Sequence, residues 1–565
     1  MMAFACAALG LQAKDGVEIR RNQVGCYPAQ EKVIVVEGAN PGGKVRVTTP
    51  DGKVVKAKSV RKAVSPLSGK TRYVVNLGNL SATGDYRVSL GDESCVLHVG
   101  ERPYRDIAET SLRLFYLIRS GVPIEQSGAY NRPLGHADTK VLVHNSAASP
   151  MRPAGTIISS PYGWYDAGDY NKYVVNAAFS MGLMLATYEQ FPEYFARLNT
   201  RIPESGNATP DLLDEIMFNL KWFLTMQDPY DGGVYHKLTT PNFEGIVMPA
   251  DCKQPRYVVA KSVTATLDFA AVMADAARLF EPYQADYPGF GAQAAAMAER
   301  AYQWGKEHPN AFYHQQQLKD PAVNTGGYGD MNSRDEFFWA ASALYRLTGK
   351  QTYLDDAKKY QPQRFTTPTW GNVSTLGSFE WLATDGSALR ETLLQQLTAY
   401  CEDVIQGVEQ SSFQSPYGNN PRDFGWGCLA EFCCCQAMAL LYADKATGTE
   451  KYRRYALQNA DYLLGRNATG YCFVTGFGDK SPMHPHHRLS DADNVEAPFP
   501  GMLVGGPNPG QQDIRDLGNA KLTYPSKVPD ESYVDAMQSY ASNEIAINWN
   551  ASLVAFICWL DALAD

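Results

Sequence analysis

The sequence has little clustered positive charge, no paired cysteine motif and no long apolar run, and each absence excludes a class of protein. The net charge is -9 and Lys and Arg form no runs, which argues against nucleic acid or an anionic membrane as a partner because phosphate binding needs clustered cations. The 11 cysteines show no CxxC spacing, and residues 433–435 place three of them in an apolar stretch typical of buried thiols. No segment after the N-terminus is apolar for long enough to cross a bilayer. We therefore expect a monomer that acts on a neutral ligand.

Residues 1–14 differ from the rest of the chain. The stretch MMAFACAALGLQA is apolar, rich in small residues and ends at Ala13 before charged residues. It resembles the hydrophobic part of a secretory signal, although the usual basic residues in front of it are missing. Cys6 has no Leu three residues before it, so a lipid anchor is not favoured. We expect export to the periplasm, the cell surface or the medium of a bacterium.

Two different periodicities divide the remaining chain. Residues 15–102 alternate between apolar and polar side chains and are interrupted by turn sequences such as PDG and ATGD, which predicts a small all-β sandwich of the Ig type. Residues 103–565 follow a helical period in many successive segments, which predicts a large all-α domain, either a closed toroid of helical hairpins or a solenoid. No repeat of fixed length is present, which favours the toroid.

Two aspartates lie three residues apart in the aromatic-rich stretch YGWYDAGDYNKYVV, residues 162–175. A turn through Ala167 and Gly168 directs the carboxylates of Asp166 and Asp169 at one small volume, where one accepts a proton from water and the other orients that water. The alternative is that Asp169 caps the helix predicted to follow. From these residues alone the two interpretations have equal weight.

Glu544 precedes an apolar helix predicted to run to the end of the chain. Beside Ile545 and Trp549 its carboxyl is expected to be partly desolvated, which raises its pKa and suits it to deliver a proton at neutral pH. The alternative is a glutamate in the first turn of a helix, where its charge complements the helix dipole.

A Pro-containing loop, GDKSPMHPHHRLSDAD, carries His484, His486, His487 and Arg488. Closely spaced histidines suit a metal, but no Cys or ordered set of carboxylates completes a ligand pattern. Hydrogen bonding to a hydroxyl-rich ligand is the favoured use of this loop.

Taken together, these stretches resemble glycoside hydrolase family 9, the inverting β-glucanase family that includes many cellulases. The resemblance covers residues 17–565. YGWYDAGDYNKYVV is similar to the catalytic-base loop of the family, FVTGFGDKSPMHPHHR to its His-x-Arg signature, and YVDAMQSYASNEIAINWNA to the signature that holds its acid. The β-rich region, which opens IRRNQVGCYP, resembles the Ig-like module of one branch. The resemblance implies an (α/α)6 toroid with an open cleft.

The resemblance also implies the chemistry: endo-acting hydrolysis of β-1,4-glucosidic bonds in plant cell-wall β-glucans with inversion at the anomeric carbon. It assigns the base to Asp169, the orientation of the water to Asp166 and the acid to Glu544. No cofactor is needed for this catalysis. His486 and Arg488 take the substrate-contact positions. Further candidates for substrate contacts are Trp549, Asp335, His236 and Tyr328.

The sequence departs from the family at several places. Gly135 stands where relatives of this branch carry a Cys before the His, so their structural zinc site is not expected. Structural calcium is known in the family, and its ligands are not assigned from this sequence. The stretch KLTTPNFEGIVMPADCKQPRY lacks the paired tryptophans of several crystalline-cellulose enzymes. We therefore expect soluble glucans, branched ones included, and the candidates are xyloglucan, mixed-linkage glucan and a cellulose-like glucan.

Two other functions stay open from the sequence. One is an exo-acting β-glucosidase-like or glucosaminidase-like member of the same family. The other is a non-catalytic glycan-binding protein, which would have no need of Asp166, Asp169 and Glu544 together.

Overall fold

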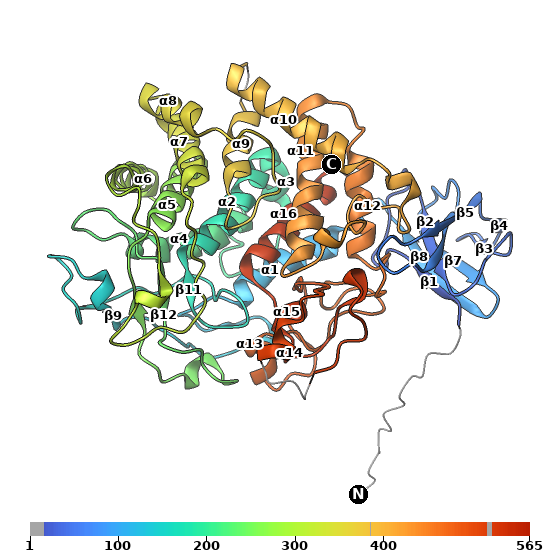
Figure 1. The fold of residues 1–565 in the computed structure, drawn as a ribbon, viewed down its shortest axis with the longest axis horizontal. Coiled ribbons are helices and arrows are strands. Elements are labelled where there is room, and N and C mark those ends of the chain that lie inside the picture. The colour runs from blue at the N-terminus through green and yellow to red at the C-terminus, as the bar shows by residue number, and fades with distance from the viewer. Residues whose placement is uncertain (1–15, 385, 517–521) are drawn as a thin grey trace, which may run out of the picture.

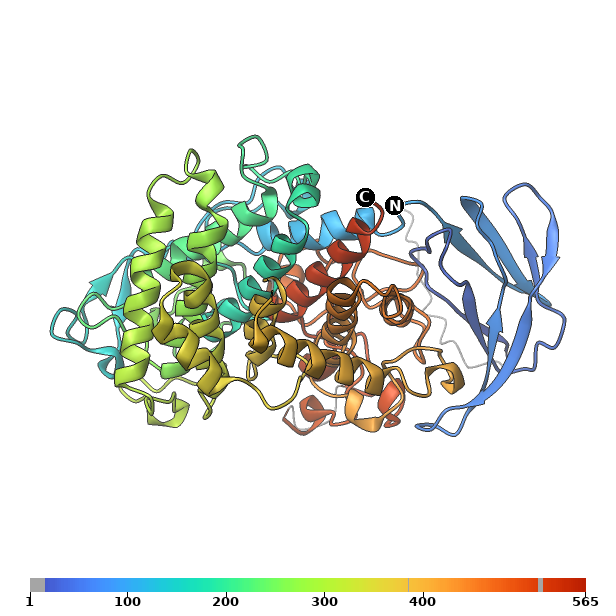
Figure 2. The same cartoon turned by 90° about the horizontal axis from the view of Figure 1, so that it is seen from above.

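The computed structural model describes residues 16–384, 386–516 and 522–565. The signal-like segment 1–14, including Cys6, lies outside the described residues. A small β-sandwich sits at one end of an elongated molecule, and a large helical domain forms the rest (Figures 1 and 2). The predicted order of an all-β domain followed by an all-α domain is thereby confirmed.

The sandwich consists of two four-stranded antiparallel sheets with the strand orders β1-β2-β6-β5 and β4-β3-β7-β8. Their strands are β1 (Glu18–Arg20), β2 (Val33–Glu37), β3 (Arg46–Thr48), β4 (Val54–Lys56), β5 (Ser59–Val64), β6 (Thr71–Asn76), β7 (Gly84–Leu90) and β8 (Glu93–Val99).

Strand β2 is buried on both faces. Ile34 and Val36 pack in the interior of the sandwich, whereas Val33 and Val35 on the opposite face belong to the core of the helical domain. Since side chains alternate between the two faces of a strand, a run of valines and isoleucine is needed where both faces are covered. The two domains therefore share a packed interface.

The helical domain is a ring of inner helices, each paired with an outer helix (Figure 1). The inner helices are α2 (Val174–Gln190), α5 (Val263–Leu279), α7 (Arg334–Thr348), α9 (Ser374–Leu382), α11 (Cys435–Thr447) and α16 (Ile547–Ala562). Their outer partners, in the same order, are α4 (Asp211–Met226), α6 (Phe290–Glu307), α8 (Gln351–Tyr360), α10 (Ala388–Val404), α12 (Arg453–Leu463) and α1 (Arg105–Leu117). This is the predicted (α/α)6 arrangement.

The sequence of each helix fits its place in the ring. Every residue of α16 is buried, as expected for a helix that is apolar on all sides. Outer helix α8 buries only Tyr353 and Ala357 and has charged residues on its open face. A π-helical turn, η8 (Leu429–Cys434), runs into α11, and Cys433–Cys435 are buried there as free thiols, as predicted. The ring closes through the contact between α2 and α16, the first and last of the inner helices.

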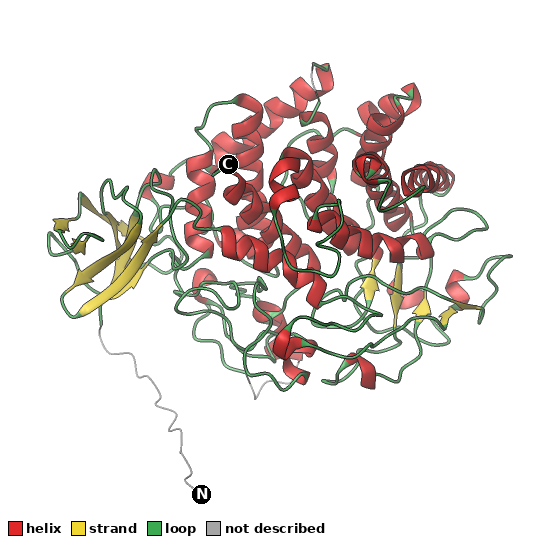
Figure 3. Ribbon diagram, turned by 180° about the vertical axis from the view of Figure 1, so that it is seen from behind, coloured by secondary structure: helices red, strands yellow, loops and turns green. Residues whose placement is uncertain are grey.

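A five-stranded sheet was not predicted. Its order is β10-β9-β13-β12-β11, built from β9 (Val141–Val143), β10 (Ile157–Ile158), β11 (Lys172–Tyr173), β12 (Lys237–Thr239) and β13 (Tyr257–Val258). Strands of two or three residues leave no readable period in the sequence, so a predominantly helical pattern does not reveal this sheet. Figure 3 shows these strands and the long loops gathered at one end of the helices. The short helices α3 (Pro192–Arg197), α13 (Arg488–Ala492), α14 (Gln512–Asp516) and α15 (Tyr540–Asn543) complete the domain.

Polar contacts add to the interface between the domains. The buried Arg72 guanidinium of β6 donates to Asp530 (3.4 Å) and lies 4.4 Å from the centre of the Phe413 ring. Asn22 donates to Asp461 at 2.9 Å. None of the helices in the described ranges is both long and apolar enough to span a membrane.

Candidate active site

The segment from Asp166 to Asn171 is a closed turn at the end of the helical ring. The amide of Asp166 donates to the carbonyl of Asn171 (3.1 Å), and the amide of Ile547 donates to the carbonyl of Asp166 (2.7 Å). The turn thus joins β11 to the start of α16. Neither aspartate caps the following helix, because α2 begins after Tyr173 without a side-chain cap. The capping alternative for Asp169 is therefore wrong.

Both oxygens of Asp166 accept hydrogen bonds from the protein. Asn176 donates to Oδ1 at 2.7 Å, and the Tyr328 hydroxyl donates to Oδ2 at 2.7 Å. Burial and the neighbouring charge of Asp169 raise the pKa of Asp166 to about 8. The carboxyl is therefore fixed in position.

Asp169 differs from Asp166 in keeping one oxygen free. Its Oδ2 accepts from Asn171 and from the Tyr173 hydroxyl (3.0 Å). Its Oδ1 takes no hydrogen bond from any residue that the structure describes. A carboxylate oxygen with a vacant lone pair is able to accept a proton from water.

Glu544 lies directly beside this turn. Its Oε1 accepts from the amide of Gly168 at 3.2 Å, and burial followed by the charge of Asp169 raises its pKa to about 8. The residue directly follows α15, as its C-cap, and comes before the start of α16. The alternative of a first-turn glutamate is wrong, and the prediction of a raised pKa agrees with the structure.

The loop of the predicted His-x-Arg signature packs against the same turn. His486 pairs with Glu544 in a parallel bridge, and its Nδ1 donates to the Met537 carbonyl at 2.7 Å. Burial lowers the pKa of His486, so the neutral ring keeps Nε2 as an acceptor. Arg488 donates from Nη1 to the Gly168 carbonyl at 2.5 Å and from Nε to the Glu244 carbonyl at 2.9 Å.

Tyr328 and, through it, His236 hold Asp166 in place from outside the predicted catalytic set. His236 is fully buried, stacks on Tyr313 and lies 2.8 Å through Nε2 from the Gly327 carbonyl. This fixes the backbone before Tyr328, whose hydroxyl binds Asp166. The predicted direct sugar contact of His236 does not fit its complete burial, whereas Tyr328 is half-exposed beside Trp370. Tyr328 thus connects the site to His236.

Comparison with known proteins identifies this arrangement. Residues 104–557 match the model of glycosyl hydrolase family 9, and residues 14–94 match the cellulase N-terminal Ig-like domain. The chain belongs to glycosyl hydrolase family 9. The predicted family, fold and glycoside hydrolase activity are confirmed.

Individual relatives cover nearly the whole chain. It is 53% identical to a xyloglucan-specific endo-β-1,4-glucanase of Bacteroides ovatus, over 97% of this chain and 94% of the relative. It is 31% identical to endoglucanase D of Acetivibrio thermocellus, over 95% and 82%. Among solved structures, Bacteroides ovatus GH9 superposes with a TM-score of 0.92 at 51% identity, covering 97% of this chain and 99% of that one. A Zn-binding triple mutant of the family 9 endoglucanase J30 superposes with a TM-score of 0.86 at 29% identity, covering 95% and 99%.

Trp549 and Asp335, which were also predicted to contact the substrate of this family 9 enzyme, are both buried. Trp549, in the first turn of α16, is 5% exposed and is so close to Gly427 that a Cβ atom there would lie 2.3 Å from its Nε1. Its burial favours a packing role over sugar stacking. Asp335 is buried at the start of α7, where it accepts from the Val373 amide at 2.9 Å.

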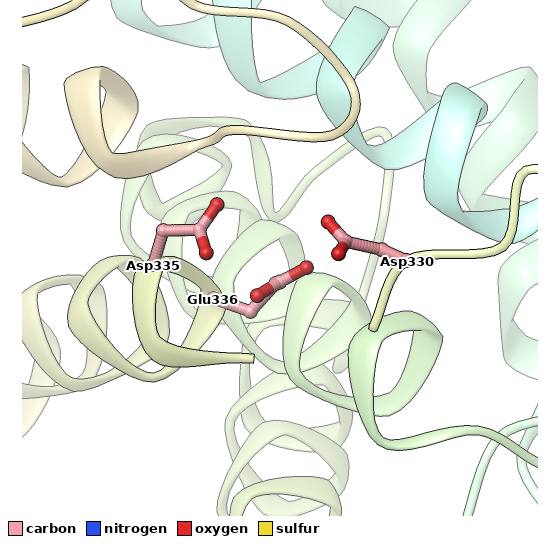
Figure 4. A group of neighbouring side chains, drawn as sticks. All are labelled: Asp330, Asp335 and Glu336. Carbon is pink, nitrogen blue, oxygen red and sulfur yellow. The ribbon is translucent and has the colours of Figure 1, made fainter. Parts of the chain in front are cut away.

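Asp335 belongs to a cluster of carboxyl groups with Asp330 and Glu336, whose oxygens lie within 4.8 Å of one another (Figure 4). The fully buried Asp268 of α5 is close enough for the charges of Asp335 and Asp330 to raise its pKa, in addition to the effect of burial. Among the residues that the structure describes, no donor bonds to either carboxyl oxygen of Asp268 or Glu336. Within the described ranges, none of these carboxyl groups pairs with Lys, Arg or His.

At Gly135 and His136, where relatives of this branch carry a structural zinc site, the described residues do not offer a matching set of ligands. A Cβ atom on Gly135 would lie 2.4 Å from Pro249 Cβ, so a cysteine has no room there. The adjacent His136 lies 3.0 Å through Nδ1 from the Tyr165 hydroxyl. In the part of the chain that the structure describes, His136 belongs to no group of three or more metal-type ligands. These residues do not fit a zinc site.

The sequence analysis missed Lys237 and Trp426. Lys237, on β12, is fully buried, and burial lowers its pKa to about 7 against the opposing effect of Asp169 and Asp166. It reaches the site because Lys237 pairs with Tyr173 in the small sheet.

Trp426 is 45% exposed, and its ring centre lies 5.5 Å from that of Tyr540. The Tyr540 ring in turn lies 6.1 Å from the His486 ring. The aromatic FGWGC loop was a signal for the Trp426 ring.

Proposed function

We propose that the enzyme is an endo-acting β-1,4-glucanase that hydrolyses xyloglucan with inversion at the anomeric carbon. The observation that carries the catalytic assignment is the turn at Gly168, whose amide binds the Glu544 carboxyl and whose next residue, Asp169, keeps Oδ1 free of hydrogen bonds from the described residues. The activity of the Bacteroides ovatus relative supports the choice of substrate.

In the proposed reaction, a water molecule attacks the anomeric carbon while Oδ1 of Asp169 accepts its proton. Glu544 donates its proton to the glycosidic oxygen, and the bond between that oxygen and the anomeric carbon breaks. Asp166 holds the same water from the side, with Asn176 and Tyr328 fixing its carboxyl. Afterwards Asp169 is protonated and Glu544 is ionised, and exchange with solvent restores both.

The neighbouring side chains bind sugar hydroxyls in this proposal. Nε2 of His486 accepts a hydroxyl proton, because Nδ1 is occupied by the Met537 carbonyl. Arg488 uses Nε and Nη1 on backbone carbonyls and has Nη2 left to donate. The exposed Trp426 ring is suited to stacking on a glucosyl unit.

The carboxyl cluster is proposed to hold a structural calcium ion. Asp268, Asp330, Asp335 and Glu336 offer oxygen ligands, which Ca²⁺ prefers. Buried carboxylates without a counter-charge are costly, and the unpartnered oxygens of Asp268 and Glu336 fit a cation. The ion would neutralise the start of α7 and takes no part in catalysis.

We also infer that the domain boundary lies between residues 102 and 103 and that the protein is a monomer. We infer export from a bacterial cell, because xyloglucan is a polysaccharide found outside cells. Light scattering of the purified chain tests the monomer, and fractionation of producing cells tests the export.

A polysaccharide panel tests the proposed function. Purified enzyme is incubated with xyloglucan, mixed-linkage β-glucan, carboxymethyl cellulose and glucomannan, and products are sized. We expect the highest kcat/KM on xyloglucan, early products of many sizes, and the α anomer first in NMR spectra. A β anomer formed first contradicts inversion, release of single end units indicates exo action, and binding without hydrolysis indicates a glycan-binding protein.

A further inference from the structure

Three large apolar side chains are exposed on the segment between β12 and β13. Phe243 is 44%, Ile246 43% and Val247 37% exposed. Contiguous exposed apolar side chains are uncommon on a soluble protein unless a ligand or partner contacts them.

The segment is held firmly by its backbone. The amide of Asn324 donates to the Pro241 carbonyl at 2.7 Å, Arg488 donates to the Glu244 carbonyl at 2.9 Å, and the Tyr170 hydroxyl donates to the Val247 carbonyl at 2.8 Å. The apolar side chains therefore remain exposed although the chain that carries them is fixed.

Two of these attachments lead directly to the proposed catalytic groups. Arg488 also donates to the carbonyl of Gly168, whose amide binds Glu544. Tyr170 follows Asp169 in the chain. The Arg488 guanidinium lies 5.5 Å from the centre of the Phe243 ring. The apolar segment is thus continuous with the substrate-binding part of the site.

We propose that Phe243, Ile246 and Val247 form a contact surface for the xylosyl branches of xyloglucan. This inference rests on the proposed function, because xyloglucan differs from other β-1,4-glucans in carrying these branches. A backbone glucosyl unit stacks best on a flat ring, whereas this surface combines one phenyl ring with two branched aliphatic side chains. A xylosyl unit lacks the hydroxymethyl group of glucose and presents a methylene at that edge, which suits an aliphatic surface.

The test compares a branched and an unbranched substrate. In Phe243→Ser and in the double variant Ile246→Ser/Val247→Ser, the ratio of kcat/KM on xyloglucan to kcat/KM on mixed-linkage glucan is expected to fall about tenfold. Most of the loss is expected in KM. Val54→Ser is the matched control, since Val54 is 63% exposed on the distant sandwich, and its ratio should equal that of wild type.

A binding measurement separates this inference from the proposed function. Calorimetry with the Glu544→Gln variant compares a xylosylated glucan oligosaccharide with an unbranched one of equal backbone length. Stronger binding of the branched ligand, lost with Phe243→Ser added, supports the surface even if the wild type fails to hydrolyse xyloglucan. Equal affinities for the two ligands, or equal losses on both substrates in the serine variants, overturn the inference.

Discussion

Gly168 determines how closely the proposed acid approaches the proposed base. A Cβ atom at this position would lie 2.6 Å from Cδ2 of His486 and 3.0 Å from Oε1 of Glu544. Its amide and carbonyl bind Glu544 and Arg488 respectively. One residue without a side chain thus joins the Asp166–Asp169 turn, the histidine loop and the acid.

Substituting the proposed acid or base is expected to abolish turnover while leaving the fold intact. Asp169→Asn removes the proton acceptor and Glu544→Gln removes the donor, so kcat on xyloglucan should fall by about 10²–10⁴. Circular dichroism and melting temperature should match those of wild type. Rates like those of wild type in either variant would refute the assignment.

The raised pKa of Glu544 predicts where activity is lost at high pH. Since the carboxyl has a pKa of about 8 in the folded protein, it carries its proton below that pH and loses it above. We expect kcat/KM to fall on the alkaline side with a midpoint near pH 8. A profile from pH 5 to 10, with the fold monitored at each pH, measures this. An alkaline midpoint near pH 5 would contradict an acid role for this carboxyl.

The residues that could be predicted from the sequence are those whose neighbours in the chain form a recognisable motif. Asp166, Asp169 and Glu544 stood out because each lies in a distinctive local motif. Lys237 did not, because its position depends on pairing between β11 and β12. The burial of Trp549 and His236 also results from packing by distant glycines and loops, which a single sequence does not reveal.

At the level of elements, we expect calcium bound by the carboxyl cluster at the first turn of α7 to stabilise the fold. Burial raises the pKa of Asp268 and Glu336, so without a cation the folded state holds more protons than the unfolded one, and stability falls as pH rises above the ordinary carboxyl pKa. Bound Ca²⁺ removes this cost. Chelation with EDTA should therefore lower Tm clearly at pH 8 and less at pH 5, by about 1 °C per kcal/mol lost for a domain of this size.

The matched control for this prediction is the double variant Asp268→Asn/Glu336→Gln. It removes both unpartnered carboxylates and should make Tm independent of calcium. Equal Tm values for the wild type with calcium and with EDTA at pH 8 would count against the cation site.

Helices and sandwich strands could be predicted, whereas the small sheet could not. The helical period extends over most of each long helix, and the turn sequences between β-strands are distinctive. Strands β9 to β13 have two or three residues each and pair across long loops. Their formation depends on the helices that hold the loops together, so no local sequence pattern predicts these strands.

At the level of the whole molecule, substituting Arg72 tests how much the contact between the two domains stabilises the protein. Arg72→Ala leaves the buried carboxyl of Asp530 without its guanidinium partner, which is expected to cost about 3–5 kcal/mol. Calorimetry of the full chain measures this as a fall in Tm. The control Arg87→Ala removes an exposed arginine of the same sandwich and should change stability by no more than about 0.5 kcal/mol. Equal effects of the two variants would contradict a stabilising interface.

The contact between α2 and α16 sets the order in which the toroid can be completed. Among the ring helices α16 is the last to leave the ribosome, so the toroid stays open until α16 has been made, and Glu544, just ahead of that helix, arrives equally late. A chain stopped before Glu544 would therefore lack ring closure and the proposed acid together.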